Sequence, residues 1–379
     1  MSTPFSSIGI LGLGLIGGSL AQALLKNAPE LKIFGFDNNT ESLNSAANIL
    51  QITSSPIELA EKSQCLVLAT PIGKYVTLLQ NIIPHFCKNL QSRKFLTDVG
   101  SLQNPLLEAT KSFANIDIVS SHPIAGSEKS GWNMANPLLF SQKMVLLSPA
   151  KNADISAFEW LWNKTGAETK IINAKEHDQR YAALSHAPHL LIFAAAKNAQ
   201  KLLSLCQNSE QQEFIKNRLR LANSNIEMWQ DITSENLASI NNICMSYAVQ
   251  VEIFTTQLKA RLLNNWRMEK QKIFSENAQK NSVFTTLPNA LKMWNALIAL
   301  LVFSQRGNDY EQLAGPAFKE ITSVLLQNPP EELSTRDIAD FQNLAAFLRN
   351  SLLGLTEIFA EPKAKKLSAW MSCIQSNFT

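Results

Sequence analysis

The chain has 379 residues, of which 45% are hydrophobic and 17% charged, so we expect a folded globular protein of two or three domains. Its 34 Lys and Arg residues against 31 Asp and Glu give a net charge of +3 without a basic block, which excludes nucleic acid as the main partner. No apolar run approaches the roughly 18 residues of a membrane span, and the strand-like start after MSTPFSS predicts no signal peptide.

The cysteines are five in number, widely separated, and never arranged as C-x-x-C. An odd and scattered set argues against a disulfide framework and against a zinc site, so we expect no metal. Free thiols are typical of a reducing compartment, and we therefore expect a cytoplasmic protein. The residues are Cys65, Cys87, Cys206, Cys244 and Cys373.

The glycines divide the chain into two parts. Eleven of the 14 lie between Gly9 and Gly166. Glycine is frequent in the tight turns of α/β folds and rare within long helices. Short apolar runs alternate with helical patterns here, which predicts βαβ units and a parallel sheet covered on both faces. The runs are Ile8–Leu11, Ile33–Phe36, Cys65–Ala69, Phe95–Thr97, Ile118–Val119, Met144–Leu147 and Thr169–Ile172. From about Lys175 onward helical spacing takes over, as in Leu190–Leu203 and Leu237–Leu258.

A glycine-rich loop joins the first predicted strand to a helix. The pattern G-x-G-x-x-G stands between the strand Ile8–Leu11 and the apolar helix Leu20–Leu25. This context favours a dinucleotide site over a turn without ligand or a methyltransferase-type sheet. We therefore predict an α/β Rossmann-type domain over residues 1–174. Its predicted cofactor-binding residues are Gly12, Leu13, Gly14, Leu15, Ile16 and Gly17, with Thr70 and Pro71 after a later strand.

Asp37 follows the second predicted strand, twenty residues after Gly17. A carboxylate at this point accepts hydrogen bonds from the adenosine ribose hydroxyls and repels a 2′-phosphate. The sequence therefore predicts NAD as the cofactor, and disfavours NADP.

Two polar residues follow later predicted strands. Ser101 ends the motif Thr-Asp-Val-Gly-Ser, and His122 comes just after the run Ile118–Val119. In a doubly wound sheet the carboxyl ends of the strands line the ligand crevice, so both side chains should face the nicotinamide. A serine and a histidine there form a hydrogen-bonding pair suited to taking the proton of an alcohol during hydride removal.

The motifs in this order and spacing resemble the prephenate/arogenate dehydrogenase family. They are GLGLIGGS at 12–19, TDVGS at 97–101, SHPIAGSEKSG at 121–131, EHD at 176–178, LSHAPHL at 184–190 and RLANSNIEMWQDI at 220–232. The resemblance covers roughly residues 7–260 and implies an NAD-dependent oxidative decarboxylation, in which hydride and CO2 leave as the ring becomes aromatic. It implies prephenate dehydrogenase activity in tyrosine biosynthesis, with arogenate dehydrogenase as the alternative.

The resemblance also implies the roles of individual residues. His122 matches the catalytic histidine that accepts the proton of the ring hydroxyl, and Ser101 matches the serine that orients it. Arg220 matches the arginine that holds a substrate carboxylate, a task suited to its planar charged fork. The other residues expected at the substrate are His189, His186, Glu128 and Ser127.

Two of these assignments have an open alternative, and one further histidine of the motifs is expected to be structural. His186 is as suited to shaping the start of a helix as to binding substrate, and Glu128 resembles a solvated loop carboxylate nearly as well. His177, within Glu-His-Asp, is expected to anchor the domain junction rather than to take part in chemistry.

The chain departs from the family pattern just before Arg220. Glycines and an acidic residue are usual there, whereas this sequence has Asn217 at the acidic position, and Gln103 where a lysine is common. Arg218 is therefore an alternative to Arg220 as the carboxylate ligand. The same departures motivate two other readings of the chain: a non-catalytic dinucleotide-binding homologue, and a dehydrogenase of another hydroxyacid.

The helical part contains a weak internal repeat. Residues 284–354 resemble residues 184–250 at an offset near 100, with Thr286 and Asn289 in place of the two histidines and Ser323 in place of Arg220. We therefore predict a helical substrate and dimerisation-type domain over 175–278 and a second helical module over 279–379, which resembles a degenerate copy of the first. Such a module would cover the apolar face that a partner subunit usually covers, giving a monomeric pseudo-dimer. A homodimer is the alternative.

Overall fold

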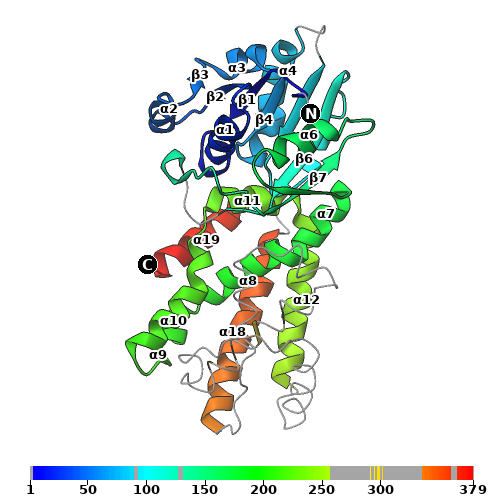
Figure 1. Ribbon diagram of the computed structural model, residues 1–379. Coiled ribbons are helices and arrows are strands. Elements are labelled where there is room, and N and C mark those ends of the chain that lie inside the picture. The colour runs from blue at the N-terminus through cyan, green and yellow to red at the C-terminus, as the bar shows by residue number, and fades with distance from the viewer. Residues whose placement is uncertain are drawn as a thin grey trace. The chain divides into compact units, whose positions relative to one another are not determined.

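The computed structural model describes residues 3–88, 93–126, 131–256, 335–359 and 365–378, with positions 291, 294, 297, 298 and 301. The chain divides into two compact units, Met1–Gln179 and Arg180–Thr379 (Figure 1). The sequence placed this boundary five residues earlier, at 174. The predicted boundary at 278 lies outside the described residues, so the division of the helical part into two modules stays a prediction.

In the described part of the first unit, eight strands form one sheet in the order β3-β2-β1-β4-β5-β6-β7-β8 (Figure 1). The Rossmann-type α/β fold is thereby confirmed, and each of the seven predicted runs corresponds to a strand, with Ala69 and Ile172 one residue beyond the ends of β4 and β8. The short β3 at the edge had no signal in the sequence. The strands are β1 (Ser7–Leu11), β2 (Lys32–Phe36), β3 (Gln51–Ile52), β4 (Cys65–Leu68), β5 (Lys94–Asp98), β6 (Ile116–Pro123), β7 (Met144–Pro149) and β8 (Glu168–Ile171).

The expectation of a wholly parallel sheet is wrong at one end. From β3 to β6 the neighbours pair in parallel, but β7 pairs antiparallel with β6, so that Pro123 lies opposite Val145. In its described part, the connection 124–143 contains only the short 3₁₀ turn η2 (Trp132–Met134). Because no crossover helix carries the chain back in this described part, β7 starts from the edge at which β6 ends.

Helices cover both faces of the sheet. Alternate residues of β1 face opposite sides, so Ile8 and Ile10 join one apolar cluster while Gly9 faces α3. A side chain at Gly9 would collide with Ser63 and contact Leu59 of that layer. The helices are α1 (Leu15–Asn27), α2 (Thr40–Ala46), α3 (Pro56–Lys62), α4 (Tyr75–Phe86), α5 (Asn104–Ala109), α6 (Ser156–Asn163) and α7 (Ala174–Tyr181).

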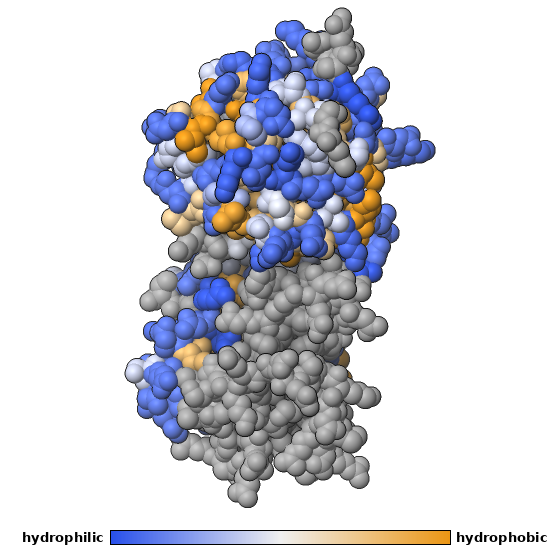
Figure 2. Space-filling model, viewed as in Figure 1, coloured by the Kyte–Doolittle hydropathy of each residue, from blue (hydrophilic) through white to orange (hydrophobic). Residues whose placement is uncertain are grey.

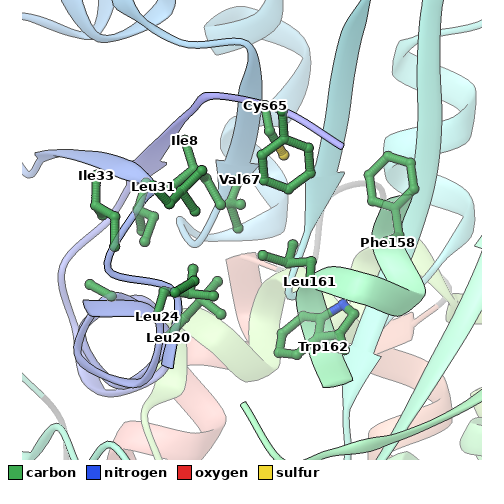
Figure 3. Close-up of a cluster of buried hydrophobic side chains, with 14 of the residues drawn as sticks. Ile8, Leu20, Leu24, Leu31, Ile33, Cys65, Val67, Phe158, Leu161 and Trp162 are labelled. Atoms are coloured by element: carbon green, nitrogen blue, oxygen red, sulfur yellow. The ribbon is translucent and has the colours of Figure 1, made fainter. Parts of the chain in front are cut away.

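The apolar cluster on the other face joins α1 and α6 to the strands. Figure 3 shows Leu20 and Leu24 of α1 and Leu161 of α6 directed toward strand residues that include Ile8 and Val67. All five side chains are fully buried. This packing places the amino end of α1 at the carboxyl ends of β1 and β4.

The second unit is helical in every part that the structure describes. The helix α8 is buried on nearly all sides, which is typical of a central helix, and α12 packs along α18 (Figure 1). The elements are the π-helical segment η3 (Ala182–His186), α8 (Ala187–Ala196), α9 (Ala199–Ser204), α10 (Ser209–Leu219), the 3₁₀ turn η4 (Arg220–Asn223), α11 (Ile226–Glu235), α12 (Leu237–Thr256), α18 (Thr335–Phe359) and α19 (Lys365–Phe378).

Three exclusions drawn from the sequence concern the membrane, metals and disulfides. Within the described ranges, no helix is long and apolar enough to cross a membrane, and no three His, Cys, Asp or Glu side chains are grouped to hold a metal ion. All five cysteines lie in these ranges as free thiols. In the view of Figure 2, the described surface of the first unit is mainly hydrophilic with apolar residues in small patches.

The cluster between α1 and α6 predicts a stability difference. Leu161→Ala should lower the free energy of unfolding by about 2–5 kcal/mol, since a fully buried leucine leaves a cavity. Leu138→Ala is the matched control, because Leu138 is 62% exposed and should change stability by less than about 0.5 kcal/mol. Urea denaturation followed by tryptophan fluorescence measures both. Equal effects of the two substitutions would contradict the assigned core.

Candidate active site

The glycine loop between β1 and α1 is shaped by two close approaches and one open position. Gly12 has φ of +100°, and a side chain there would collide with the carbonyl oxygen of Ala69. A side chain at Gly17 would collide with the carbonyl oxygen of Gly12. At Gly14, by contrast, an added Cβ would meet nothing within 4 Å. The loop is therefore closed where helix and strand touch and open where a ligand would approach the backbone.

The amino end of α1 suits an anion. Gly14 is the N-cap residue and has no side chain to cap the helix, so the N–H groups of the first turn, from Leu15 to Gly17, face the open position. These N–H groups and the positive end of the helix dipole favour a phosphate. The residues fit the pyrophosphate of a dinucleotide, as the sequence predicted.

Asp37 lies beside this loop, directly after β2. The N–H of Leu13 donates to its Oδ2 at 2.6 Å, and the N–H of Asn39 donates to its Oδ1 at 2.8 Å. A carboxylate has about four lone-pair positions, so two remain to accept ribose hydroxyls. The backbone of the loop thus orients the side chain expected to select the cofactor.

Thr70 and Pro71 follow β4 on the other side of the loop. The position of a Cβ on Gly12 lies 3.2 Å from the backbone nitrogen of Thr70, so the two turns are in contact. The hydroxyl of Thr70 is buried and has no hydrogen-bond partner in the part of the chain that the structure describes. A bound group would satisfy it, which is consistent with the predicted place of both residues in the cofactor site.

The carboxylate of Asp98 ties the carboxyl end of β5 to β6. Asp98 is fully buried, and its Oδ1 accepts the hydroxyl of Ser120 at 2.8 Å and the N–H of Ser121 at 2.9 Å. Burial raises the pKa of Asp98 to about 7, against these hydrogen bonds, which lower it. The bonds continue the contact of the two strands beyond their last paired residues, Thr97 and Val119.

His122 and Ser101 lie at this end of the sheet. Ser101 is half-buried, three residues after β5. The sequence placed His122 just after a strand, but it lies within β6, opposite Leu146 of β7. The reason is the hairpin: pairing with β7 extends β6 to Pro123. The first unit therefore brings the predicted catalytic pair to the same edge of the sheet as the glycine loop.

A second histidine contacts His122. Nδ1 of His122 lies 2.9 Å from Nε2 of His177, and the two rings meet edge-on with centroids 5.1 Å apart. Nδ1 of His177 lies 2.8 Å from Oδ1 of Asp178. The sequence placed His177 at the domain junction, and it lies two residues before the boundary of the first unit, where it also contacts the predicted catalytic histidine. The orienting role of Ser101 stays a prediction.

In the second unit, a π-helical segment precedes the two histidines of the S-H-x-P-H motif. Pro188 has no N–H and its ring crowds the carbonyl four residues earlier, so a regular helix cannot pass through it undisturbed. The wider turns of η3 absorb this misfit, and such insertions are frequent at functional sites. His186 is buried at the end of η3, and His189 follows within α8.

His189, Trp229 and Arg220 lie together. The ring of His189 packs on the indole of Trp229 with centroids 4.2 Å apart and an interplanar angle of 31°. Its Nδ1 donates to the carbonyl oxygen of Ser185 at 3.0 Å, since a carbonyl can only accept. Burial, aided by the positive charge of Arg220, lowers the pKa of His189 to about 4, against the opposing effect of that hydrogen bond. A neutral histidine and an arginine thus share one site.

The local structure separates Arg220 from Arg218. Helix α10 ends at Leu219, and Arg220 begins η4. The carbonyls of Ala222, within η4, and of Ser224, just after it, accept hydrogen bonds from the side-chain amide of Gln375 of α19 at 2.9 Å each. Arg218 is still within α10, and its guanidinium stacks on the ring of Phe214 at 4.8 Å. The charge that acts on His189 is that of Arg220, which favours it as the substrate ligand.

The remaining predicted substrate residues, Ser127 and Glu128, lie outside the described residues. Conversely, three residues that contact predicted site residues were not predicted from the sequence as functional: His177 and Asp178 in the first unit and Trp229 in the second. All three stand in motifs that the sequence analysis quoted, but only the fold brings them to His122 and His189.

Two domain models of one family match the chain. They are described as the prephenate dehydrogenase nucleotide-binding domain, over residues 20–171, and the prephenate dehydrogenase dimerization domain, over residues 173–276. Together they cover more than half of the chain. The chain belongs to the prephenate/arogenate dehydrogenase family.

Individual members of the family are also similar to this chain in sequence and in structure. Prephenate dehydrogenase of Bacillus subtilis (strain 168) is 29% identical over 238 residues, which are 60% of this chain and 63% of that protein, less than two thirds of its length. Cyclohexadienyl dehydrogenase of Zymomonas mobilis is 25% identical over 63% of this chain and 83% of its own. The crystal structure of prephenate dehydrogenase from A. aeolicus in complex with hydroxyphenyl propionate and NAD+ has a TM-score of 0.57 and 25% identity over 70% of this chain and 96% of that one.

The packing of His189 predicts its titration. Between pH 8 and about 5.5 its ring signals should stay those of neutral imidazole, because the pKa of about 4 lies well below this range and below the ordinary value of 6.5. Arg220→Gln should raise the pKa, since a neighbouring positive charge disfavours the imidazolium. Arg218→Gln is the matched control and should leave it unchanged. NMR of the chain labelled with ¹⁵N-histidine measures all three, and an effect confined to Arg218 would reverse the assignment of the two arginines.

Proposed function

We propose that the chain is an NAD-dependent prephenate dehydrogenase, which converts prephenate to 4-hydroxyphenylpyruvate by oxidative decarboxylation in tyrosine biosynthesis. One observation carries the proposal: a dinucleotide-type loop and a histidine oriented for proton transfer lie at the same edge of the sheet, in a chain of this family. The A. aeolicus relative, crystallised with NAD+ and hydroxyphenyl propionate, supports it. Arogenate is the alternative substrate.

His122 accepts the proton of the ring hydroxyl. Its Nδ1 faces His177, so Nε2 is the nitrogen that takes part in the reaction. NAD, when bound, takes up the hydride from the carbon that bears the hydroxyl. As the carbonyl forms, the bond to the ring carboxylate breaks and CO2 leaves. Its electron pair makes the ring an aromatic phenolate, which takes the proton back from His122 to give the phenol. Aromatisation drives the reaction, so the protein mainly positions the ring and takes the proton.

Arg220 and His189 bind the substrate. Arg220 provides a permanently charged, planar fork for a carboxylate. With its hydrogen on Nδ1, neutral His189 presents Nε2 as an acceptor toward a hydroxyl or an amide. A neutral neighbour is required here, because an imidazolium would repel Arg220 and compete with it for the carboxylate.

The cofactor is NAD rather than NADP. Asp37 is held beside the loop by two backbone N–H groups, so a 2′-phosphate on the ribose would meet a carboxylate. The reducing cytoplasm is the location that suits five free thiols.

The chain is a monomer in which α18 takes the place of a second subunit. Four buried residues of α12 match four buried residues of α18 at an offset of 101, close to the offset of the sequence repeat. The pairs are Ile240 and Phe341, Cys244 and Ala345, Tyr247 and Leu348, and Val251 and Leu352. Because α12 packs against α18, one helix contacts its own counterpart, as two subunits do across a twofold interface.

The first test of the function is turnover. The purified chain should form NADH, followed at 340 nm, with prephenate or arogenate and not with a simple 3-hydroxyacid. His122→Asn should lower kcat by about 10²–10⁴-fold while NAD binding is retained, since a positioned acid–base group is lost. Absence of turnover with all three compounds would favour the non-catalytic reading, and wild-type kcat in His122→Asn would remove His122 from the mechanism.

Asp37→Ser should raise the KM for NAD and lower the preference for NAD over NADP, because a hydrogen-bond acceptor and a repulsive charge are both lost. Initial rates with the two cofactors measure this preference. Glu41→Gln, which removes a nearby exposed charge on α2, is the control. A wild-type chain that prefers NADP would refute the role of Asp37.

Light scattering tests the pseudo-dimer. A monomer has the mass of one chain, 42.0 kDa, whereas a homodimer has twice this mass, about 84 kDa. We expect the first value across the micromolar range. A mass near the second would show that another copy, rather than α18, covers the dimerisation face.

A further inference from the structure

Asp178 is surrounded by hydrogen-bond donors. Its Oδ1 accepts the N–H of Gln103 at 2.8 Å and lies 2.8 Å from Nδ1 of His177. Its Oδ2 accepts the N–H and the side-chain amide of Asn104 at 3.0 and 2.8 Å. The side chain is 8% exposed. Backbone N–H groups can only donate, so the carboxylate acts as an acceptor throughout, and the hydrogen on the side facing His177 belongs to Nδ1 of that ring.

The contact with Asp178 determines which nitrogen of His177 carries the hydrogen. His177 has no exposed surface, and burial lowers its pKa against the opposing effect of the Asp178 carboxylate, which favours the neutral ring. With hydrogen on Nδ1, its Nε2 carries a lone pair and accepts. The partner at 2.9 Å is Nδ1 of His122, which must then carry a hydrogen of its own. That leaves the lone pair of His122 on Nε2.

We infer that His177 and Asp178 are positioning residues, which hold His122 in the one tautomer that can accept a proton at Nε2. The inference rests on the proposed role of His122 as the proton acceptor. It goes beyond that role, because it assigns the orientation and protonation of the base to residues of α7 rather than to Ser101 alone.

Fixing the tautomer has a clear chemical benefit. A neutral imidazole carries its hydrogen on either nitrogen, and only the form with a lone pair on Nε2 can take the proton of the hydroxyl. When His122 becomes an imidazolium, its Nδ1–H still donates to His177, and the chain of hydrogen bonds ends on a carboxylate that stabilises the positive charge. Asp178 also holds the backbone of Gln103, two residues after Ser101, so one carboxylate anchors both predicted catalytic segments.

The kinetic test compares two replacements of His177. In His177→Gln the side-chain oxygen can accept from His122 while the amide donates to Asp178, so kcat should stay within about tenfold of the wild type. His177→Leu removes the acceptor and should lower kcat by about 10- to 10⁴-fold, with little change in the KM for substrate. The upper limit is the loss of roughly 10⁴-fold that a wrong histidine tautomer causes in a serine protease. Leu161→Ala is the control for lost stability, since it should lower the melting temperature without lowering kcat.

The spectroscopic test does not depend on turnover. In the full chain labelled with ¹⁵N-histidine, two-bond ¹H–¹⁵N spectra distinguish the two tautomers of each ring. We expect His122 and His177 to carry hydrogen on Nδ1, and His122 to redistribute toward the Nε2–H form in His177→Leu.

The outcomes are distinct. A wild-type His122 with its hydrogen on Nε2, or a His177→Leu variant with unchanged kcat, would overturn the positioning role. Equal losses of kcat in His177→Gln and His177→Leu would also overturn it, since that pattern indicates a packing role only. The expected tautomers in a chain that oxidises neither prephenate nor arogenate would support the positioning role and refute the proposed function.

Discussion

The buried carboxylate of Asp98 joins β5 to β6 where their regular pairing ends, and the catalytic edge of the first unit depends on this contact. Without it, β5 and β6 would lose two hydrogen bonds at the ends that lead to Ser101 and His122, and this edge would depend on the pairing of β6 with β7 and on the contacts of Asp178. The other functional residues of this unit follow from one geometrical constraint. Neighbouring parallel strands end at one edge, so the turns after β1, β2, β4 and β5 meet there and share a single ligand site.

A second buried carboxylate, that of Asp178, connects the backbone after β5 to the proposed base, His122. Asp178 of α7 binds the amino end of α5 through the backbone of Gln103 and Asn104, and it binds His122 through His177. Both carboxylates are buried and accept hydrogen bonds from the backbone, Asp98 from Ser121 and Asp178 from Gln103 and Asn104. Burial raises the pKa of Asp98 to about 7. Together they fix both the backbone and the hydrogen positions of the proposed base.

Much of the site was predictable because its signals are local. The loop from Gly12 to Gly17 and the carboxylate of Asp37 depend on a few neighbouring residues, and the fold placed them as expected. The direction of β7 was not predictable, since it depends on how residues 124–143 return to the sheet. The bond between His122 and His177 joins residues 55 positions apart, and only tertiary structure brings them together. The choice between Arg220 and Arg218 likewise depends on where α10 ends.

The central claim is that this chain oxidises and decarboxylates prephenate in one coupled reaction. Its most direct test is the stoichiometry of the purified full-length chain with prephenate and NAD, measured as NADH by absorbance, CO2 by trapping and the aromatic product by mass spectrometry. The account predicts equal amounts of NADH, CO2 and 4-hydroxyphenylpyruvate. Loss of prephenate without NADH, or NADH formed without CO2 and the phenol, would contradict it.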